Sequence, residues 1–316
     1  MRVWNTNSPF HSGSAITRLH TVAQCSGDGS ISRHPTPTTN LPDVVTIAHL
    51  SDVHMGSTTP SVLDALVADV HHHQPDVVVV SGDLTMRARK REFAAARNFL
   101  ARLPQPQLVV IGNHDVPLYD LTTRFTAPYS RYRRELSDDL DPVLDVPGAR
   151  LLGLQSMPRW RWKSGRVSSR QAALVSTVFT APQQHDQGPD SDATPTTPAL
   201  RVLVLHHPPS LSGLATMAKI GSLDRALARG RVDVVLAGHT HIPRVSEYPV
   251  HHDRQLSRVV EVVCGTSASS RTRGAPMAWM IVQADAANIS VTARIRADQN
   301  WEIGGLATFA RQRHDV

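Results

Sequence analysis

The sequence predicts an α/β protein in which short buried strands alternate with amphipathic helices. Short runs of Val, Ile and Leu end abruptly in polar residues, and segments with helical periodicity separate several of these runs. The composition agrees, because 41% of the 316 residues are hydrophobic, only 5% are aromatic, and 18 glycines and 22 prolines supply frequent turns. A chain of this length can bury a sizeable core. We expect one large domain.

Six of the apolar runs predict strands that are buried on both faces. They lack the strict alternation of a half-buried strand, as expected for the interior of a parallel sheet. Further runs at 259–263 and 280–294 predict later strands, which we assign to a second sheet. The six runs are 44–50, 77–80, 108–111, 151–154, 202–205 and 232–237.

Three segments between these runs predict helices. Residues 60–70 place their apolar side chains on one helical face, with Thr59 able to cap the first turn. Residues 92–103 repeat this pattern, and Ser168 with Gln171 has the spacing of a capping box. The order strand, helix, strand predicts a parallel sheet with right-handed crossovers in the first half of the chain.

Polar segments without periodicity set the predicted limits of the domain. Residues 1–42 are rich in Ser, Thr, Pro, Asn and His, which predicts a disordered leader. Residues 181–199 have a similar composition and predict a flexible insertion. We therefore expect the folded domain to span residues 43–298, followed by a C-terminal tail of residues 299–316.

The net charge indicates which binding partners to expect, and the cysteine content indicates in which cellular compartment the protein works. The formal net charge of +6 and the pI near 9.9 favour anionic partners such as phosphates, nucleotides, nucleic acid or acidic membrane surfaces. Cys25 and Cys264 lie far apart, so neither a disulfide framework nor a thiolate zinc site is indicated. No apolar stretch reaches the roughly 18 residues of a membrane span. We expect a cytoplasmic protein, whereas the oligomeric state is not predicted.

Side chains that can bind metals recur where the predicted strands end. Because the carboxyl ends of parallel strands meet at one edge of a sheet, we expect these side chains to lie close together. Glycines beside several of them permit the tight turns that such an approach requires. The motifs are Asp52-Val53-His54, Gly82-Asp83, Gly112-Asn113-His114-Asp115, His206-His207-Pro208-Pro209 and Gly238-His239-Thr240-His241.

The mixture of ligand types in these motifs predicts a site for transition metals. Asp and Asn supply hard oxygen ligands and imidazole suits zinc, iron and manganese, so the set favours Mn, Fe or Zn over calcium. The absence of thiolates argues against a closed structural zinc site. Two metal ions roughly 3.5 to 4 Å apart need a shared ligand, and the carboxylate of Asp83 can bridge them.

The five motifs, in this order, resemble those of the calcineurin-like metallophosphoesterases, whose pattern is DxH, GD, GNH followed by Asp or Glu, a lone His, and GHxH. The resemblance covers about residues 44–241. It implies an α/β/β/α fold, in which a sandwich of two sheets is flanked by helices. It also implies two metal ions, one held by Asp52, His54, Asp83 and His241, and the other by Asp83, Asn113, His206 and His239.

The resemblance further implies a hydrolytic mechanism. Two cations would lower the pKa of a bridging water, so that a metal-bridging hydroxide attacks the phosphorus atom, and they would neutralise the phosphoryl oxygens. His114 is implied to stabilise the developing charge or to protonate the leaving alkoxide, and Asp115 to fix the orientation of His114. Of the adjacent pair His206 and His207, we expect His206 to be the ligand.

The details of the motifs favour a phosphodiester as the substrate. Ser-Gly-Asp-Leu-Thr, His-His-Pro-Pro and Ala-Gly-His-Thr-His resemble the motifs of bacterial class III cyclic-nucleotide and glycerophosphodiester phosphodiesterases. We therefore expect an enzyme that hydrolyses a small-molecule phosphodiester such as a cyclic nucleotide. The alternatives are a DNA repair-type nuclease or a nucleotide-lipid pyrophosphatase of the same superfamily, and an inactive scaffold with the same fold.

Two basic segments are candidate contacts for an anionic substrate. Arg87 and the cations at 89–91 follow the second motif closely enough to approach the metal cleft, or else they form a solvated helical turn. Residues 159–170 contain five basic residues, no acidic residue, and the rings of Trp160 and Trp162. This composition can stack a base or grip a nucleic-acid strand, or the tryptophans can simply cover the sheet.

Overall fold

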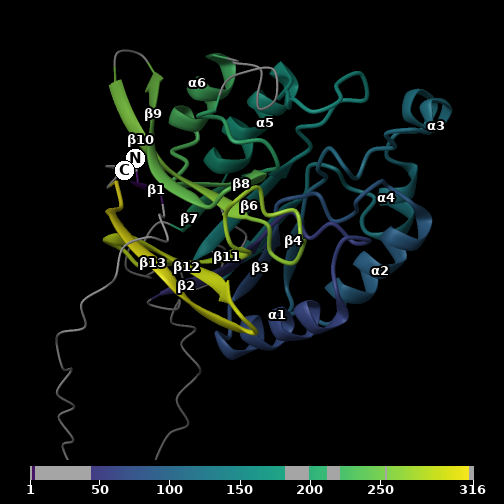
Figure 1. Ribbon diagram of the computed structural model, residues 1–316. Helices are drawn as coiled ribbons and strands as arrows, with labels where there is room; N and C mark the ends of the chain where they lie inside the picture. The colour runs from purple at the N-terminus through teal and green to yellow at the C-terminus, as the bar shows by residue number, and fades with distance from the viewer. Residues whose placement is uncertain (1, 4–43, 182–198, 212–220, 253–254, 313–316) are drawn as a thin grey trace, which may run out of the picture.

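The computed structural model describes residues 2–3, 44–181, 199–211, 221–252 and 255–312. Two β-sheets pack against each other, and helices cover their outer faces (Figure 1). This is the α/β/β/α sandwich that the resemblance implied. Among the described residues, no helix is both long enough and apolar enough to span a bilayer.

The first sheet has six strands in the order β13-β12-β11-β2-β3-β4. Strands β2, β3 and β4 run parallel and are connected through α1 and α2, whereas β11, β12 and β13 pair antiparallel. The bounds are β2 (Val45–Leu50), α1 (Pro60–His72), β3 (Val77–Val80), α2 (Lys90–Leu100), β4 (Gln107–Val109), β11 (Ala278–Ala284), β12 (Asn288–Ala297) and β13 (Asn300–Ala310).

The second sheet has seven strands in the order β1-β9-β10-β8-β7-β6-β5, of which β6, β7, β8 and β10 run parallel. Two short helices, α3 (Leu121–Thr126) and α4 (Ser130–Glu135), connect the first sheet to this one. The remaining bounds are β1 (Arg2–Val3), β5 (Val143–Val146), β6 (Ala149–Leu154), α5 (Ser169–Thr180), β7 (Leu200–Leu205), α6 (Gly221–Arg229), β8 (Val234–His241), β9 (Arg244–His252) and β10 (Gln255–Gly265).

Strand β7 shows why the apolar runs lack alternation. Val202 and Val204 belong to the core that the two sheets share, whereas Leu203 and Leu205 pack in a second core with α5 and α6. Side chains of a strand point alternately to its two faces, so a strand buried on both faces needs an apolar residue at every position. The same arrangement holds for β3, in which all four residues of Val77–Val80 are buried.

Of the two helix-capping predictions, the structure confirms the one for α5 but not the side-chain cap of α1. The predicted capping box is confirmed, because Gln171 N–H donates to Ser168 Oγ at 3.2 Å and Ser168 N–H donates to Gln171 Oε1 at 3.0 Å. Thr59 is the N-cap residue of α1, but its side chain makes no capping hydrogen bond. Pro60 presets the backbone of that first turn, which reduces the need for one.

The C-terminal boundary and the second-sheet assignment need correction. Residues 300–310, predicted to be part of a tail, form β13, which pairs along its length with β12. The run 280–294 comprises two strands, β11 and β12, and these extend the first sheet, because β11 pairs with β2. Of the predicted leader, Arg2–Val3 pairs with β9. Most of the predicted insertion lies outside the described residues.

Candidate dinuclear metal centre

All five motifs lie at the carboxyl ends of parallel strands or in the loops directly after them. The motifs after β2, β3 and β4 face those after β7 and β8 across the sandwich. Gly238 N–H donates to the His206 carbonyl at 3.0 Å within the second sheet. His239 N–H donates to Asp52 Oδ2 at 2.9 Å, which ties the two sheets together at this edge. The topology therefore brings residues nearly 190 positions apart in the chain into direct contact.

Five of the predicted ligands adopt a left-handed backbone conformation, which is costly for residues other than glycine. Such a conformation costs on the order of 1–3 kcal/mol per residue and persists mainly at functional sites, where the surrounding structure enforces it. The φ angles are 51° for Asp52, 51° for His54, 54° for Asp83, 69° for His239 and 61° for His241.

Two motif glycines are required by close approach of the chain. A Cβ atom on Gly238 would lie 1.8 Å from Ser51 Oγ, and one on Gly112 would lie 2.2 Å from Asp83 Oδ1. Real Cβ atoms do not make contacts this short, so any side chain at these positions would push the motifs apart. The glycines therefore set the spacing of the ligands.

The first cluster consists of Asp52, His54, Asp83 and His241, all buried, with one ligand atom of each within 4.8 Å of the others. Asp52 Oδ1 lies 3.1 Å from His241 Nε2 and 3.7 Å from His54 Nε2. His54 Nδ1 faces the Thr85 carbonyl at 3.2 Å, and His241 Nδ1 faces the Arg271 carbonyl. Each ring can donate Nδ1–H to a carbonyl, which leaves Nε2 free to bind a metal.

The second cluster consists of Asn113, His206 and His239. Asn113 Oδ1 lies 3.2 Å from His206 Nε2 and 2.9 Å from His239 Nδ1, so three ligand atoms converge. His206 Nδ1 donates to the Ser81 carbonyl at 2.8 Å, which again directs Nε2 inward. Asp83 Oδ2 lies 3.3 Å from His206 Nε2 and 3.8 Å from His54 Nε2, so this carboxylate faces both clusters.

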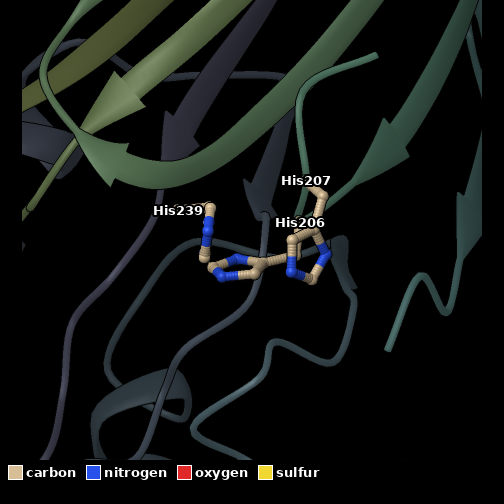
Figure 2. Close-up of side chains that lie close together, drawn as sticks. All are labelled: His206, His207 and His239. Atoms are coloured by element: carbon tan, nitrogen blue, oxygen red, sulfur yellow. The ribbon is translucent and has the colours of Figure 1, made fainter. Parts of the chain in front are cut away.

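His207 lies beside the second cluster but both of its ring nitrogens are engaged elsewhere. Figure 2 shows its ring next to those of His206 and His239, with a centroid distance of 4.5 Å to His239. Its Nδ1 lies 2.8 Å from Ser156 Oγ, and its Nε2 lies 2.8 Å from the Lys163 carbonyl. One ligand atom each of His206, His207 and His239 lies within 4.8 Å of the others. Because both nitrogens of His207 have other partners, we keep His206 as the proposed ligand.

Substitution of the two adjacent histidines should separate their roles. We expect His206→Ala to lower the bound metal to about one ion per chain, because it removes a ligand from one of two ions. His207→Ala should retain both ions, because the two ring nitrogens of His207 contact Ser156 and Lys163 rather than a metal site. Elemental analysis of the two purified variants measures this, and loss of an ion from His207→Ala with full occupancy in His206→Ala would reverse the assignment.

The charges of Asp83 and His206 stabilise each other. Burial disfavours ionisation of Asp83, but the charge of His206 holds the pKa of Asp83 well below its usual range. Burial also lowers the pKa of His206, yet the Asp83 carboxylate outweighs it and raises this pKa to about 9. Burial lowers the pKa of His54 to about 4, so this ring is neutral at pH 7. A metal ion must displace the His206 proton, so acid weakens metal binding.

The residues present fit a pair of cations. Asp52 Oδ1 is buried and accepts no hydrogen bond, which is costly for a carboxylate oxygen without a cation nearby. His54 Nε2 and His241 Nε2 lie 3.2 Å apart, and with both Nδ1 atoms donating to carbonyls, two lone pairs face each other. A metal ion between them would convert this repulsion into coordination.

His114 and Asp115 occupy different positions relative to these clusters. His114 Nδ1 donates to the Met86 carbonyl at 2.8 Å, so its Nε2 is the atom available to a substrate. Asp115 is buried and accepts hydrogen bonds from Thr85 N–H at 2.8 Å and Gly112 N–H at 2.9 Å. The orientation of the His114 ring thus depends on Met86, whereas Asp115 joins the loops after β3 and β4. The expected direct role of Asp115 on the ring is corrected.

The environment of Asp115 is consistent with this structural role. Burial and the charge of Asp83 raise the pKa of Asp115 to about 6, although hydrogen bonds from Gly112 and Thr85 oppose the shift. Four donors surround the carboxylate, because Leu84 N–H and Thr85 Oγ1 also donate to it. A buried carboxylate with this many donors stabilises the loops that carry the ligands.

Arg271 is a site residue that the sequence analysis missed. Its carbonyl accepts from His241 Nδ1, and its guanidinium Nη1 lies 3.4 Å from His114 Nε2. Arg271 follows β10, a strand parallel to β8, so it lies at the same edge of the sheet as the motifs. A polar run, Thr266 to Arg271, directly after the predicted strand 259–263 was the available signal.

A cavity of about 530 Å³ opens next to the two clusters. Asp83, Asn113, His114 and His239 form the part of its wall nearest the candidate metal site. The rest of its wall is rich in cations and aromatic rings, and comprises Met86, Arg87, Leu118, Tyr119, Trp162, Lys163, Arg271 and Arg273. A binding site of this size and charge suits a small anionic molecule.

Sequence comparison identifies relatives with phosphoesterase names. The chain is 27% identical over 214 residues to a probable cyclic nucleotide phosphodiesterase from Synechococcus, across 62% of this chain and 73% of that protein. It is 29% identical over 226 residues to glycerophosphodiester phosphodiesterase GpdQ from Enterobacter lignolyticus, across 64% and 73%. It is 24% identical over 232 residues to UDP-2,3-diacylglucosamine pyrophosphatase LpxG from Chlamydia trachomatis, across 63% of this chain and 64% of that protein.

Solved structures with the same fold include a purple acid phosphatase from yellow lupin seeds and PhoD. The lupin enzyme has a TM-score of 0.59 at 14% identity, and 85% of this chain spans 54% of that one. PhoD has a TM-score of 0.58 at 12% identity, with 88% and 71% covered. A profile of the calcineurin-like phosphoesterase family matches residues 45–243. The chain therefore belongs to the calcineurin-like phosphoesterase family, whose members are metal-dependent phosphoesterases.

Proposed function

We propose that the protein is a dinuclear-metal phosphodiesterase that hydrolyses a small-molecule phosphodiester, with cyclic nucleotides as the leading substrate class. The observation that carries the proposal is that the predicted ligand side chains, Asn113 included, lie in two adjacent clusters beside a cavity lined by several cations. Mn, Fe or Zn suits this set of imidazole and oxygen ligands. The ligands are Asp52, His54 and His241 for one ion, Asn113, His206 and His239 for the other, and Asp83 for both.

Bound metal ions would supply a water of lowered pKa as the nucleophile and would neutralise phosphoryl oxygens. The chain itself supplies the remaining functions. His114 Nε2 faces the cavity region, where it can donate a proton to the leaving oxygen. Arg271, within 3.4 Å of that nitrogen, can hold a phosphoryl oxygen against it.

The choice of a phosphodiester rests on the names of the relatives together with the cavity. Two of the relatives are named as a cyclic nucleotide phosphodiesterase and a glycerophosphodiester phosphodiesterase. The cavity of about 530 Å³ leaves room for a substituent on each side of a phosphate. A third relative is named as a pyrophosphatase, which supports a nucleotide-lipid pyrophosphate as the second candidate substrate.

A substrate panel tests the proposal directly. Purified protein loaded with manganese should hydrolyse bis-p-nitrophenyl phosphate and cyclic nucleotides with higher kcat/KM than p-nitrophenyl phosphate. The panel should also contain a glycerophosphodiester, a nucleoside diphosphate sugar and DNA. Much faster hydrolysis of p-nitrophenyl phosphate would reject phosphodiester specificity, and preferential cleavage of the diphosphate sugar or DNA would favour the pyrophosphatase or the nuclease.

The inactive scaffold makes a different prediction. A scaffold has no need to retain metal ligands, whereas the predicted ligands of this chain, Asn113 included, lie close together. Two bound metal ions per chain in the elemental analysis would agree with an enzyme. A protein that binds no metal under any loading condition would support the scaffold instead.

A further inference from the structure

Two exposed aromatic rings line the substrate cavity on separate segments of the chain. Tyr119 follows the third motif after β4 and is 73% exposed, and Trp162 lies between β6 and α5 and is 45% exposed. Large aromatic side chains usually bury most of their surface in the core, and here the core contains Trp279 and Tyr132 as fully buried examples. The exposed pair is therefore available to a ligand.

A buried arginine holds Trp162 in place. The guanidinium of Arg124, on α3, lies 4.4 Å from the centroid of the Trp162 ring, and the Arg124 side chain is completely buried. The same guanidinium donates to the Pro117 carbonyl at 2.8 Å and to the Arg161 carbonyl. Arg124 thus fixes both segments that carry the aromatic rings, and it covers one face of Trp162 with a cation.

A second anchor connects the Trp162 segment to the metal clusters. His207 Nε2 lies 2.8 Å from the Lys163 carbonyl, and its Nδ1 lies 2.8 Å from Ser156 Oγ. Gly165 packs so closely on His207 that a Cβ atom there would lie 2.4 Å from the ring. Because His207 directly follows a predicted ligand, Trp162 is held at a fixed place relative to the reacting centre.

The rest of the cavity wall favours a planar ligand group with polar edges over an aliphatic one. Its only aliphatic side chains among the described lining residues are Met86 and Leu118, whereas Arg87, Lys163 and Arg273 line it as cations. A hydrocarbon chain would leave these charges poorly solvated without matching apolar contact. A planar ring with polar edges instead stacks on aromatic faces and hydrogen-bonds to the cations around it.

We propose that Tyr119 and Trp162 form a nucleobase-binding subsite, which positions the base of a nucleotide phosphoester while its phosphate lies at the metal centre. The inference rests on the proposed function for the position of the phosphate, and it specifies the substrate as one that carries a base. Arg124 is a positioning residue, since it acts through Trp162 and Pro117. The base can belong to a mononucleotide or to a nucleic-acid strand.

Trp162→Ala and Trp160→Ala form a matched pair that tests the subsite. Trp160 lies two residues away in the same segment and is 61% exposed, but it is not among the described residues that line the cavity. We expect Trp162→Ala to lower the ratio of kcat/KM for a cyclic nucleotide to that for a glycerophosphodiester by about tenfold, because stacking strengthens binding of one base by roughly that factor. Trp160→Ala should leave the ratio unchanged, and Trp162→Phe should restore most of it.

A binding measurement separates failure of this inference from failure of the proposed function. Calorimetric titration with adenosine monophosphate and with a deoxyadenylate oligonucleotide should show weaker binding to Trp162→Ala, and the ligand that binds more tightly to the wild type identifies the source of the base. Equal effects of Trp160→Ala and Trp162→Ala, or no effect of either, would overturn the subsite. If no substrate is hydrolysed by the wild type, the proposed function fails while the titrations still decide the subsite.

Discussion

Asp83→Ala is expected to remove both metal ions and to lower phosphodiesterase turnover by about 10³-fold or more, because bound metals supply several kcal/mol of transition-state stabilisation. The reason is geometric. Asp83 Oδ2 lies 3.3 Å from His206 Nε2 and 3.8 Å from His54 Nε2, so the carboxylate faces both ligand clusters. Elemental analysis and kcat for bis-p-nitrophenyl phosphate measure the two effects on the same sample.

His54→Ala is the matched control for Asp83→Ala. His54 belongs only to the cluster with Asp52 and His241, so its loss should leave about one ion per chain. Asp83→Asn keeps a structural contact of Asp83 while it removes the negative charge. His114 N–H donates to Asp83 Oδ1 at 2.8 Å, and the amide oxygen of Asn can still accept this hydrogen bond. Loss of metal from this variant is therefore not due to loss of that contact. Two ions per chain in Asp83→Ala, with an intact circular dichroism spectrum, would show that Asp83 does not bridge.

The sequence predicted this site because each ligand follows a buried parallel strand. Once β2, β3 and β4 are parallel, geometry requires Asp52, Asp83 and Asn113 to lie at one edge, whatever the rest of the chain does. The glycines of the motifs carried a second signal, since Gly112 and Gly238 are needed where another segment comes within contact distance. Both signals are local in the sequence, and so the α/β class and the convergence of these side chains could be predicted, whereas the assignment of ligands to each ion came from the resemblance to the family.

The missed features depend on side-chain direction and on long-range pairing. Nothing in Gly112-Asn113-His114-Asp115 indicates that Asp115 turns inward to Thr85 rather than towards the His114 ring. The assignment of 280–294 failed because strand β11 pairs with β2, which precedes it by more than 200 residues. The burial of Arg124 against Trp162 could not be predicted either, because a basic residue on a short helix is normally exposed to solvent.

His114→Ala should lower kcat by about 10²- to 10⁴-fold while both metal ions stay bound, because the change removes a general acid and no ligand. The His114 side chain contacts the Met86 carbonyl and Arg271, and its ring packs edge-on against the ring of His54 at a centroid distance of 4.8 Å. His114 nevertheless belongs to neither group of potential ligands. His71→Ala offers a control, because that exposed histidine lies on α1, away from the cavity, and its Nε2 donates to the Arg102 carbonyl at 2.8 Å. Its kcat should equal that of the wild type.

The loss of activity in His114→Ala should depend on the leaving group if His114 is a general acid, and should not depend on it if His114 has another role. A leaving group that is already stable as an anion, such as p-nitrophenolate, needs little help from a proton donor, whereas the alkoxide of a glycerophosphodiester needs much. His114→Ala should therefore impair hydrolysis of the glycerophosphodiester far more than that of bis-p-nitrophenyl phosphate. Equal losses for both substrates would assign His114 to phosphate binding with Arg271, because stabilisation of the phosphoryl oxygens does not depend on which alkoxide departs.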